Sequence, residues 1–162
     1  MRVSFKIPNF SEKLWRELPE NPLIGKELTE RQAIGDPQVI LPGEYDNQWH
    51  LFYHGFLFAP DGSWPPIFVH CVSPDGIHWS EKQRWNWPTG PHYMYCDGDR
   101  WIMYYTRMLH YTPGLTEKYG CHAIIRAKTT RDFINWSDDT DIILPETTAE
   151  REAKGYKRAI LA

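Results

Sequence analysis

Apolar and aromatic residues are grouped in short runs along this chain, and Gly, Pro or Asp residues lie between the runs. Short runs bounded by turn residues are typical of β-strands, whereas an amphipathic helix repeats its apolar positions every three or four residues. The dipeptide Asp97-Gly98 predicts a tight hairpin, because Gly adopts positive φ without strain. The pattern therefore predicts antiparallel sheets, with the clearest strands at residues 49–55, 67–73, 101–107 and 123–129.

The same order of runs occurs twice. Trp49 begins a strand in the first unit as Trp101 does in the second, and Trp79 and Trp136 follow corresponding turns. An antiparallel four-stranded unit of roughly 50 residues has the size of a β-propeller blade. The repeat divides a single domain, residues 1–162, into an N-terminal flank (1–34), two blade-like units (about 35–80 and 90–137) and a C-terminal tail (138–162).

Composition supports an all-β fold with little helix. The 162 residues include 8 Trp, 9 Tyr and 7 Phe, and 41% of them are hydrophobic, which excludes a disordered chain. The 13 Pro residues recur throughout and argue against a helical bundle. Only residues 146–154, which follow Pro145, have a helical pattern.

Two blade-like units are too few to close a β-propeller. Propellers typically close with about 4 to 8 blades, and two units leave exposed strand edges that pair readily with other chains. We therefore expect a partial five-bladed propeller, either a fragment of a longer protein or one part of an assembly. The simplest assembly is a two-fold homo-dimer.

The charge pattern excludes several partners. The net charge is -3, with no basic block to neutralise phosphates, so we expect no nucleic-acid partner. No apolar run approaches the roughly 20 residues that span a bilayer, and no apolar signal region is visible, so we expect a cytoplasmic protein without a membrane partner. Cys71, Cys96 and Cys121 have no paired spacing and are expected to be reduced thiols. We expect no cofactor.

Several segments together resemble the five-bladed β-propeller glycoside hydrolases, the group that includes family 43, family 32 and the family 130 phosphorylases. The segments that carry the resemblance are residues 21–24, 36–40, 49–55, 73–80 and 130–137. The resemblance implies that Asp36 is the first-blade carboxylate, the general base or nucleophile. Such enzymes pair it with a second, protonated carboxyl group.

The rest of that catalytic machinery has no match. His92 stands near the position where family 43 has a second-blade Asp, and no Glu matches the third-blade general acid, because the sequence ends soon after Glu146, Glu150 and Glu152. We therefore expect an isolated chain that hydrolyses glycosides weakly or not at all.

Five further residues are candidates for sugar binding. His54 and His92 offer hydrogen bonds to hydroxyls, and Arg107 offers a guanidinium at a strand end. Trp64 and Trp87 lie in Pro-rich loops, where an aromatic ring can stack on a sugar. Each also has a structural alternative: His as a hydrogen-bonded sheet residue, Arg as a surface charge, and Trp as a cover for a neighbouring blade. We expect no metal site, although His50, His54 and His70 form a conceivable trio.

Two functions follow from these observations. The first is a carbohydrate-active protein that resembles propeller glycoside hydrolases. The alternative is a non-catalytic sugar-binding or interaction module, since residues 73–79 also resemble the Asp-box of sialidases. A second carboxylate within about 10 Å of Asp36 would favour the first function.

Overall fold

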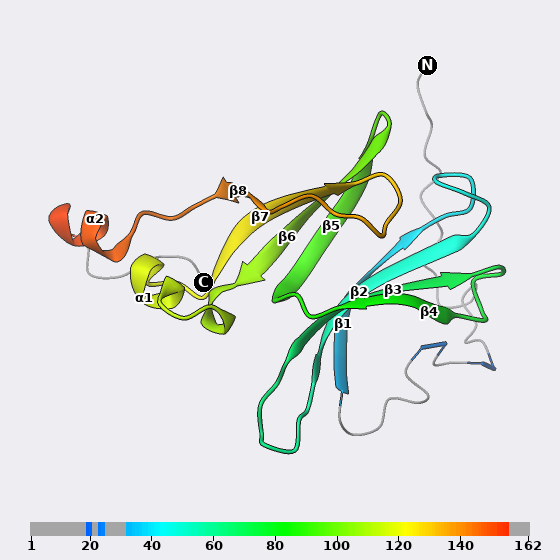
Figure 1. The fold of residues 1–162 in the computed structure, drawn as a ribbon, viewed down its shortest axis with the longest axis horizontal. Helices are drawn as coiled ribbons and strands as arrows, with labels where there is room; N and C mark the ends of the chain where they lie inside the picture. The colour runs from blue at the N-terminus through cyan, green and yellow to red at the C-terminus, as the bar shows by residue number, and fades with distance from the viewer. Residues whose placement is uncertain (1–18, 21–22, 25–31, 156–162) are drawn as a thin grey trace, which may run out of the picture.

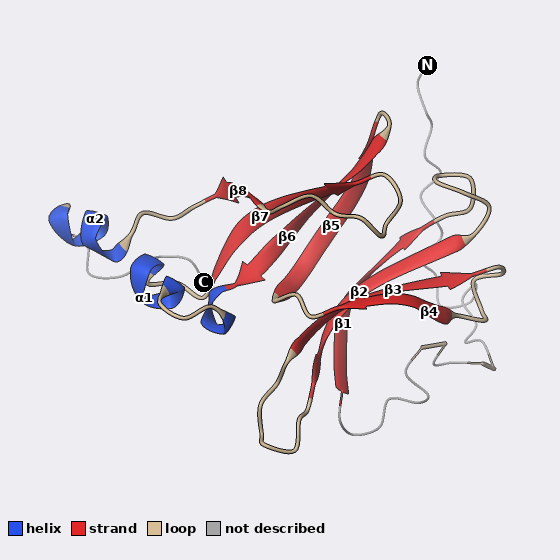
Figure 2. Cartoon of the chain, viewed as in Figure 1, coloured by secondary structure: helices blue, strands red, loops and turns tan. Residues whose placement is uncertain are grey.

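A computed structural model describes residues 19–20, 23–24 and 32–155, and it contains two four-stranded antiparallel sheets (Figures 1 and 2). The first sheet consists of β1 (Gln32–Ile40), β2 (Trp49–Leu57), β3 (Pro66–Ser73) and β4 (Ser80–Trp85). The second consists of β5 (Thr89–Asp97), β6 (Arg100–Met108), β7 (Ala123–Thr130) and β8 (Thr140–Ile143). In both sheets the strands follow one another in chain order. The prediction of an all-β fold with two antiparallel units is confirmed.

The two sheets pack together through an aromatic core. Strand alternation places Phe52 of β2 and Phe68 of β3 on one face of the first sheet, where they meet Trp101 and Met103 of β6. Phe133, from the turn after β7, is fully buried against Phe52 and Trp101. At their junction β5 contacts β1, β2 and β3, so the two sheets form one packed body, although the described residues do not close into a ring.

The opposite face of the first sheet has its own apolar cluster. It contains the alternate residues of β2 and β3, with Trp79 packed against them: Leu51, Tyr53, Ile67, Val69 and Cys71. Ile24 also packs here, while the rest of the predicted N-terminal flank before residue 32 lies almost entirely outside the described residues. Burial on both faces explains why β2 and β3 are nearly continuous hydrophobic runs.

Asp75 and Asp132 occupy corresponding positions in the two repeated units, and both form turns. Asp75 accepts 2.8 Å hydrogen bonds from the backbone N–H groups of Ile77 and His78, and these bonds hold its pKa well below the usual range. Asp132 accepts equivalent bonds from Ile134 and Asn135. Both carboxylates are therefore used within their own turns.

The helices lie after β6 and β8. Beyond β6 the chain forms a 3-10 turn, η2 (Leu109–Tyr111), and α1 (Leu115–Tyr119), neither of which the sequence pattern indicated. α2 (Thr148–Ala153) lies within the predicted helical segment and begins with a capping box between Thr147 and Glu150. In the part of the chain that the structure describes, no helix has the length and apolar character needed to cross a membrane.

Candidate functional site

A backbone irregularity on β1 exposes Asp36. The pairing of β1 with β2 shifts between Gly35 and Gln38, which is a β-bulge, and Asp36 within it has φ 50°. Positive φ is unfavourable for a residue with a Cβ, although Asp tolerates it better than most. Strained residues at bulges are common at functional sites, where the bulge directs a side chain away from the regular sheet.

The carboxylate of Asp36 lies beside His54 of β2. Oδ2 of Asp36 is 3.3 Å from Nδ1 of His54, and the Asp36 side chain is 49% exposed while that of His54 is 10% exposed. The contact does not have hydrogen-bond geometry, so Nδ1 is buried without a hydrogen-bond partner. Burial lowers the pKa of His54, and the charge of Asp36 opposes that shift. His54 is therefore a neutral imidazole at pH 7 with an unused polar atom.

His92 of β5 completes the group at the junction of the sheets. Both of its ring nitrogens are buried without a hydrogen-bond partner, and its ring meets Phe68 edge-on at 5.0 Å. Burial, followed by repulsion from His54 when that imidazole is protonated, lowers the pKa of His92 to about 4, and the charge of Asp36 opposes this shift. His92 also lines a shallow pocket of about 260 Å³ with Tyr93 and Tyr104.

These three side chains can bind hydroxyl groups. Asp36 offers exposed acceptor oxygens, and each neutral imidazole has one donor and one acceptor nitrogen. Unpaired buried polar atoms are unfavourable, so a small ligand hydroxyl or a water molecule that reaches His92 is stabilised. The titratable groups that shift the pKa of His92 are His54 and Asp36.

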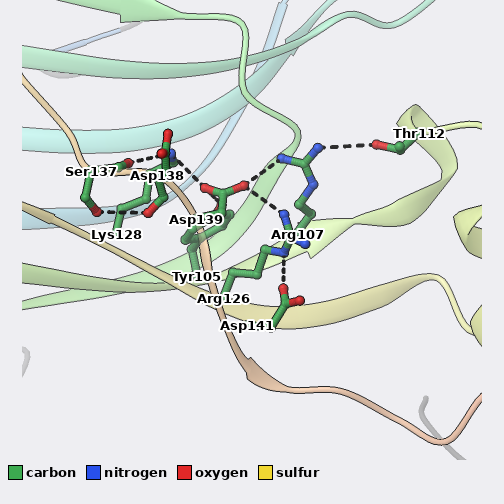
Figure 3. Close-up of polar contacts among 9 residues, drawn as sticks. All are labelled: Tyr105, Arg107, Thr112, Arg126, Lys128, Ser137, Asp138, Asp139 and Asp141. Atoms are coloured by element: carbon green, nitrogen blue, oxygen red, sulfur yellow. Dashed lines mark hydrogen bonds and ion pairs between the residues drawn. The ribbon is translucent and has the colours of Figure 1, made fainter.

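Arg107 is bound within the second sheet (Figure 3). Its guanidinium lies 3.2 Å from Oδ2 of Asp139 and donates a 3.3 Å hydrogen bond to Thr112. The same carboxylate accepts hydrogen bonds from Tyr105 (2.7 Å) and Arg126 (2.9 Å), and it pairs with Lys128 at 2.7 Å. This set, the Asp139 cluster, joins the segment before β8 to β6 and β7.

Electrostatics favour the ionised form of Asp139. Burial alone would raise its pKa, but hydrogen bonds from Lys128 and Tyr105 and the charge of Lys128 hold the pKa below its usual value. Arg126 has a second acidic neighbour in Asp141. Arg107 therefore already has intramolecular partners in Asp139 and Thr112.

The two candidate tryptophans have different surroundings. Trp64 is 56% exposed in the β2–β3 loop, with its ring centroid 4.6 Å from that of Phe58. Trp87 is partly buried against the core that joins the sheets, stacked at 4.8 Å on Trp85, with Nζ of Lys128 5.2 Å from its ring centroid. The ring of Trp64 is thus open to a ligand, whereas neighbours pack around Trp87.

The trio of His50, His54 and His70 is divided by the structure. Nδ1 of His50 is 2.9 Å from Nε2 of His70, and Nε2 of His50 is 2.9 Å from Asp46. His54 instead contacts Asp36. In the described ranges no group of three or more His, Cys, Asp or Glu side chains is arranged to hold a metal ion.

The sequence did not indicate the hydrogen-bonded chain of Asp46, His50 and His70, nor the hydrogen bond from Tyr111 to the backbone of Trp64. Strand alternation was the available signal for the histidine pair, because it places His50 and His70 on the same face of adjacent strands.

Comparisons with known proteins give a likeness of fold. No protein-family model matches the sequence, and no curated protein matches it. An N-acetylgalactosamine deacetylase from F. plautii, solved in complex with blood group B trisaccharide, is similar over 75% of this chain and 39% of its own, with a TM-score of 0.54 and 14% identity. A glycosyl hydrolase from Bacteroides ovatus matches over 65% of this chain and 30% of its own, with a TM-score of 0.47 and 13% identity. The chain therefore spans well under half the length of either structure.

Proposed function

We propose that this chain is a carbohydrate-active protein of β-propeller architecture that binds sugar hydroxyls at Asp36, His54 and His92. The observation that carries the proposal is the gathering of these three residues at the junction of the sheets. Asp36 is exposed at a strained position, and His92 is buried with both nitrogens unpaired. Polar groups with shifted pKa values that lie close together are a common feature of binding sites.

The arrangement of the sheets supports the propeller part of the proposal. Each sheet is a four-stranded meander in chain order, and the first strands of the two sheets, β1 and β5, contact each other. Adjacent propeller blades have this relationship around a central axis. The sheets needed to close the ring would come from a second copy of the chain in a dimer, or from further sequence in a longer protein.

The chemistry at the site favours binding over turnover. Glycosidases that use two carboxyl groups hold them about 5 to 9.5 Å apart, one as acid and one as base or nucleophile. Asp36 fits the second role, and the imidazole of His92, with its pKa of about 4, is not a reservoir of protons at neutral pH. We therefore propose that the isolated chain binds sugars and hydrolyses glycosides weakly or not at all.

The alternative is a non-catalytic sugar-binding or interaction module. One observation favours it: the exposed ring of Trp64 offers a stacking surface that requires no catalysis. If a closing partner supplies a carboxylic acid near Asp36, the first function holds for the assembly.

A paired assay separates these functions. Aryl arabinosides, xylosides and galactosides test turnover, while tryptophan fluorescence with the corresponding sugars and with blood group B trisaccharide tests binding. We expect binding without robust turnover, and we expect Asp36→Asn to abolish the binding. Asp138→Asn serves as the control, because Asp138 is exposed and remote in sequence from the site. Robust turnover abolished by Asp36→Asn would refute the inactivity of the isolated chain.

A further inference from the structure

Two loops, one from each sheet, contribute side chains to an aromatic group on the surface. The hydroxyl of Tyr111, in η2, donates a 2.8 Å hydrogen bond to the carbonyl oxygen of Trp64, in the β2–β3 loop. The ring of Tyr111 also stacks on Phe56 of β2, with centroids 6.4 Å apart and planes 24° apart. We refer to Phe56, Phe58, Trp64 and Tyr111 as the Trp64 platform.

The platform is continuous with the candidate site. Phe56 lies two residues after His54 on β2, and strand alternation places both on one face. The ring of Phe56 meets that of His54 edge-on, with centroids 6.0 Å apart. Ring contacts therefore lead from His54, beside Asp36, through Phe56 to Tyr111, and the hydroxyl of Tyr111 reaches the backbone of Trp64.

The loop that carries Trp64 is held in one conformation. The backbone N–H of Ala59 donates to Ser63 at 2.9 Å, that of Gly62 donates to Ala59 at 3.0 Å, and Asp61 accepts from Ser63 at 2.9 Å. The Tyr111 bond adds an anchor from the other sheet, and burial raises the pKa of Tyr111, which keeps its hydroxyl protonated as a donor. A ring held in place in advance loses less conformational entropy when a ligand binds.

The chemistry of the platform suits a further sugar unit. A pyranose has an apolar C–H face and a polar rim, and an exposed aromatic ring can cover the apolar face while the rim stays in water. The ring of Trp64 packs against Phe58, yet more than half of the Trp64 surface is exposed.

We infer that the Trp64 platform is an extended subsite and that the ligand is an oligosaccharide, which runs from Asp36 and His54 to Trp64. Tyr111 is a positioning residue that holds the Trp64 loop against the second sheet. This inference rests on the proposed function, because it assumes that a sugar binds at Asp36.

The test compares sugars of different length. Arabinose, xylose and galactose are titrated against the ¹⁵N-labelled protein in parallel with linear arabinotriose, xylotriose and galactotriose. For the preferred sugar we expect the trisaccharide to bind more tightly than its monosaccharide. Trp64→Ala should weaken the trisaccharide about tenfold, which corresponds to about 1.4 kcal/mol, and leave the monosaccharide unchanged.

Tyr111→Phe tests the positioning role. It keeps the ring and removes the hydrogen bond to Trp64, so we expect about a threefold loss for the trisaccharide alone, which corresponds to roughly 0.7 kcal/mol. We also expect a smaller ligand-induced shift of the Trp64 indole resonance, which Trp64→Ala identifies. Tyr45→Phe, at an exposed position in the loop between β1 and β2, is the matched control and should behave as wild type.

The outcomes separate the two proposals. If wild type binds sugars through Asp36 but Trp64→Ala leaves the preference for the trisaccharide intact, the platform inference is wrong and the proposed function stands. If Asp36→Asn has no effect while Trp64→Ala abolishes all binding, the site at Asp36 is wrong. If wild type binds none of the six sugars, both are wrong.

Discussion

Gln38 of β1 bridges the two sheets by bonding both backbone groups of Met94 in β5. Its Nε2 donates to the Met94 carbonyl oxygen at 2.7 Å, and its Oε1 accepts from the Met94 N–H at 2.7 Å. The side-chain amide thus takes the place of a neighbouring strand at the point where β1 and β5 meet, 56 residues apart in sequence. Because Asp36 and His92 each lie two residues before these partners, the bridge also fixes the spacing of the candidate site.

Replacement of Gln38 should therefore weaken the junction. Gln38→Leu leaves the backbone groups of Met94, a buried residue, without partners, and each unsatisfied group costs about 1–3 kcal/mol. We expect the free energy of unfolding in urea to fall by about 2–4 kcal/mol. Gln48→Leu, at an exposed position, is the control. Equal stability of both variants would show that the bridge contributes nothing.

The Asp139 cluster makes a second prediction about stability. Asp139→Asn removes the charge that Arg107, Arg126 and Lys128 share, and among the described residues only Arg126 of these three cations keeps an acidic partner, Asp141. We expect a loss of about 2 kcal/mol, below the range for a fully buried pair because the Asp139 side chain is 17% exposed. Asp138→Asn, at the neighbouring exposed position, should change thermal unfolding little. An equal loss of stability in Asp139→Asn and Asp138→Asn would show that the Asp139 cluster does not stabilise the fold.

Acid should destabilise the fold through two histidines. Burial is the main reason that the pKa of His70 falls from 6.5 to about 3 and that of His92 to about 4. An unfolded His titrates near 6.5, so between pH 6.5 and about 4 the unfolded chain binds more protons than the folded one. The stability that these neutral histidines provide is present above pH 6.5 and is lost as pH falls toward the folded pKa values.

The size of this effect is measurable by urea unfolding at several pH values. From pH 7 to pH 5 we expect a loss of about 2 kcal/mol for each of the two histidines. In His70→Leu, the share due to His70 should vanish from the pH dependence, whatever the absolute stability of the variant. His122→Gln, at an exposed site, should retain the wild-type slope. If the unfolding free energy of His70→Leu depended on pH as steeply as that of wild type, the lowered pKa assigned to His70 would be wrong.

Asp36 is expected to lower the stability of the fold and to strengthen sugar binding. Its positive φ costs roughly 1–2 kcal/mol in a residue with a Cβ, while Gly has more unfolded-state entropy to lose. We expect Asp36→Gly to be as stable as wild type or more stable by up to about 1 kcal/mol, and to bind sugar at least about tenfold more weakly. Calorimetry and a sugar titration on the same sample give both values. A marked loss of stability would mean that the carboxylate serves the fold.

Strand pattern and turn chemistry predicted much of this architecture. The runs around Trp49 and Trp101 became β2 and β6, and Asp97-Gly98 became the β5–β6 hairpin, with Gly98 at φ 68°. β8 was missed, because Thr140–Ile143 is short and its four residues are all exposed, so no alternation marks it. α1 was missed because tertiary packing of Tyr119, in a cluster with Leu109 and Ile124, stabilises a helix too short to be stable alone.

The candidate site was harder to predict. The sequence indicated three candidate residues separately: Asp36, His54 and His92. Their proximity depends on the bulge in β1 and on the contact between β1 and β5, and no local sequence pattern encodes either feature. For Arg107 the sequence suggested a sugar-binding guanidinium or a surface charge, and it did not indicate the contact with Asp139, 32 residues away. Register between distant strands decides such contacts.

The imidazole of His92 gives the most direct test of the central claim, because both of its nitrogens are buried without a hydrogen-bond partner at the junction of the sheets. Its NMR resonances are followed while arabinose, xylose, galactose and their linear trisaccharides are added at millimolar concentration. The account predicts a saturable shift of the His92 resonances with at least one of these sugars, and the loss of that shift in Asp36→Asn. Unchanged His92 resonances with every sugar, or a shift of equal size in Asp36→Asn, would contradict it.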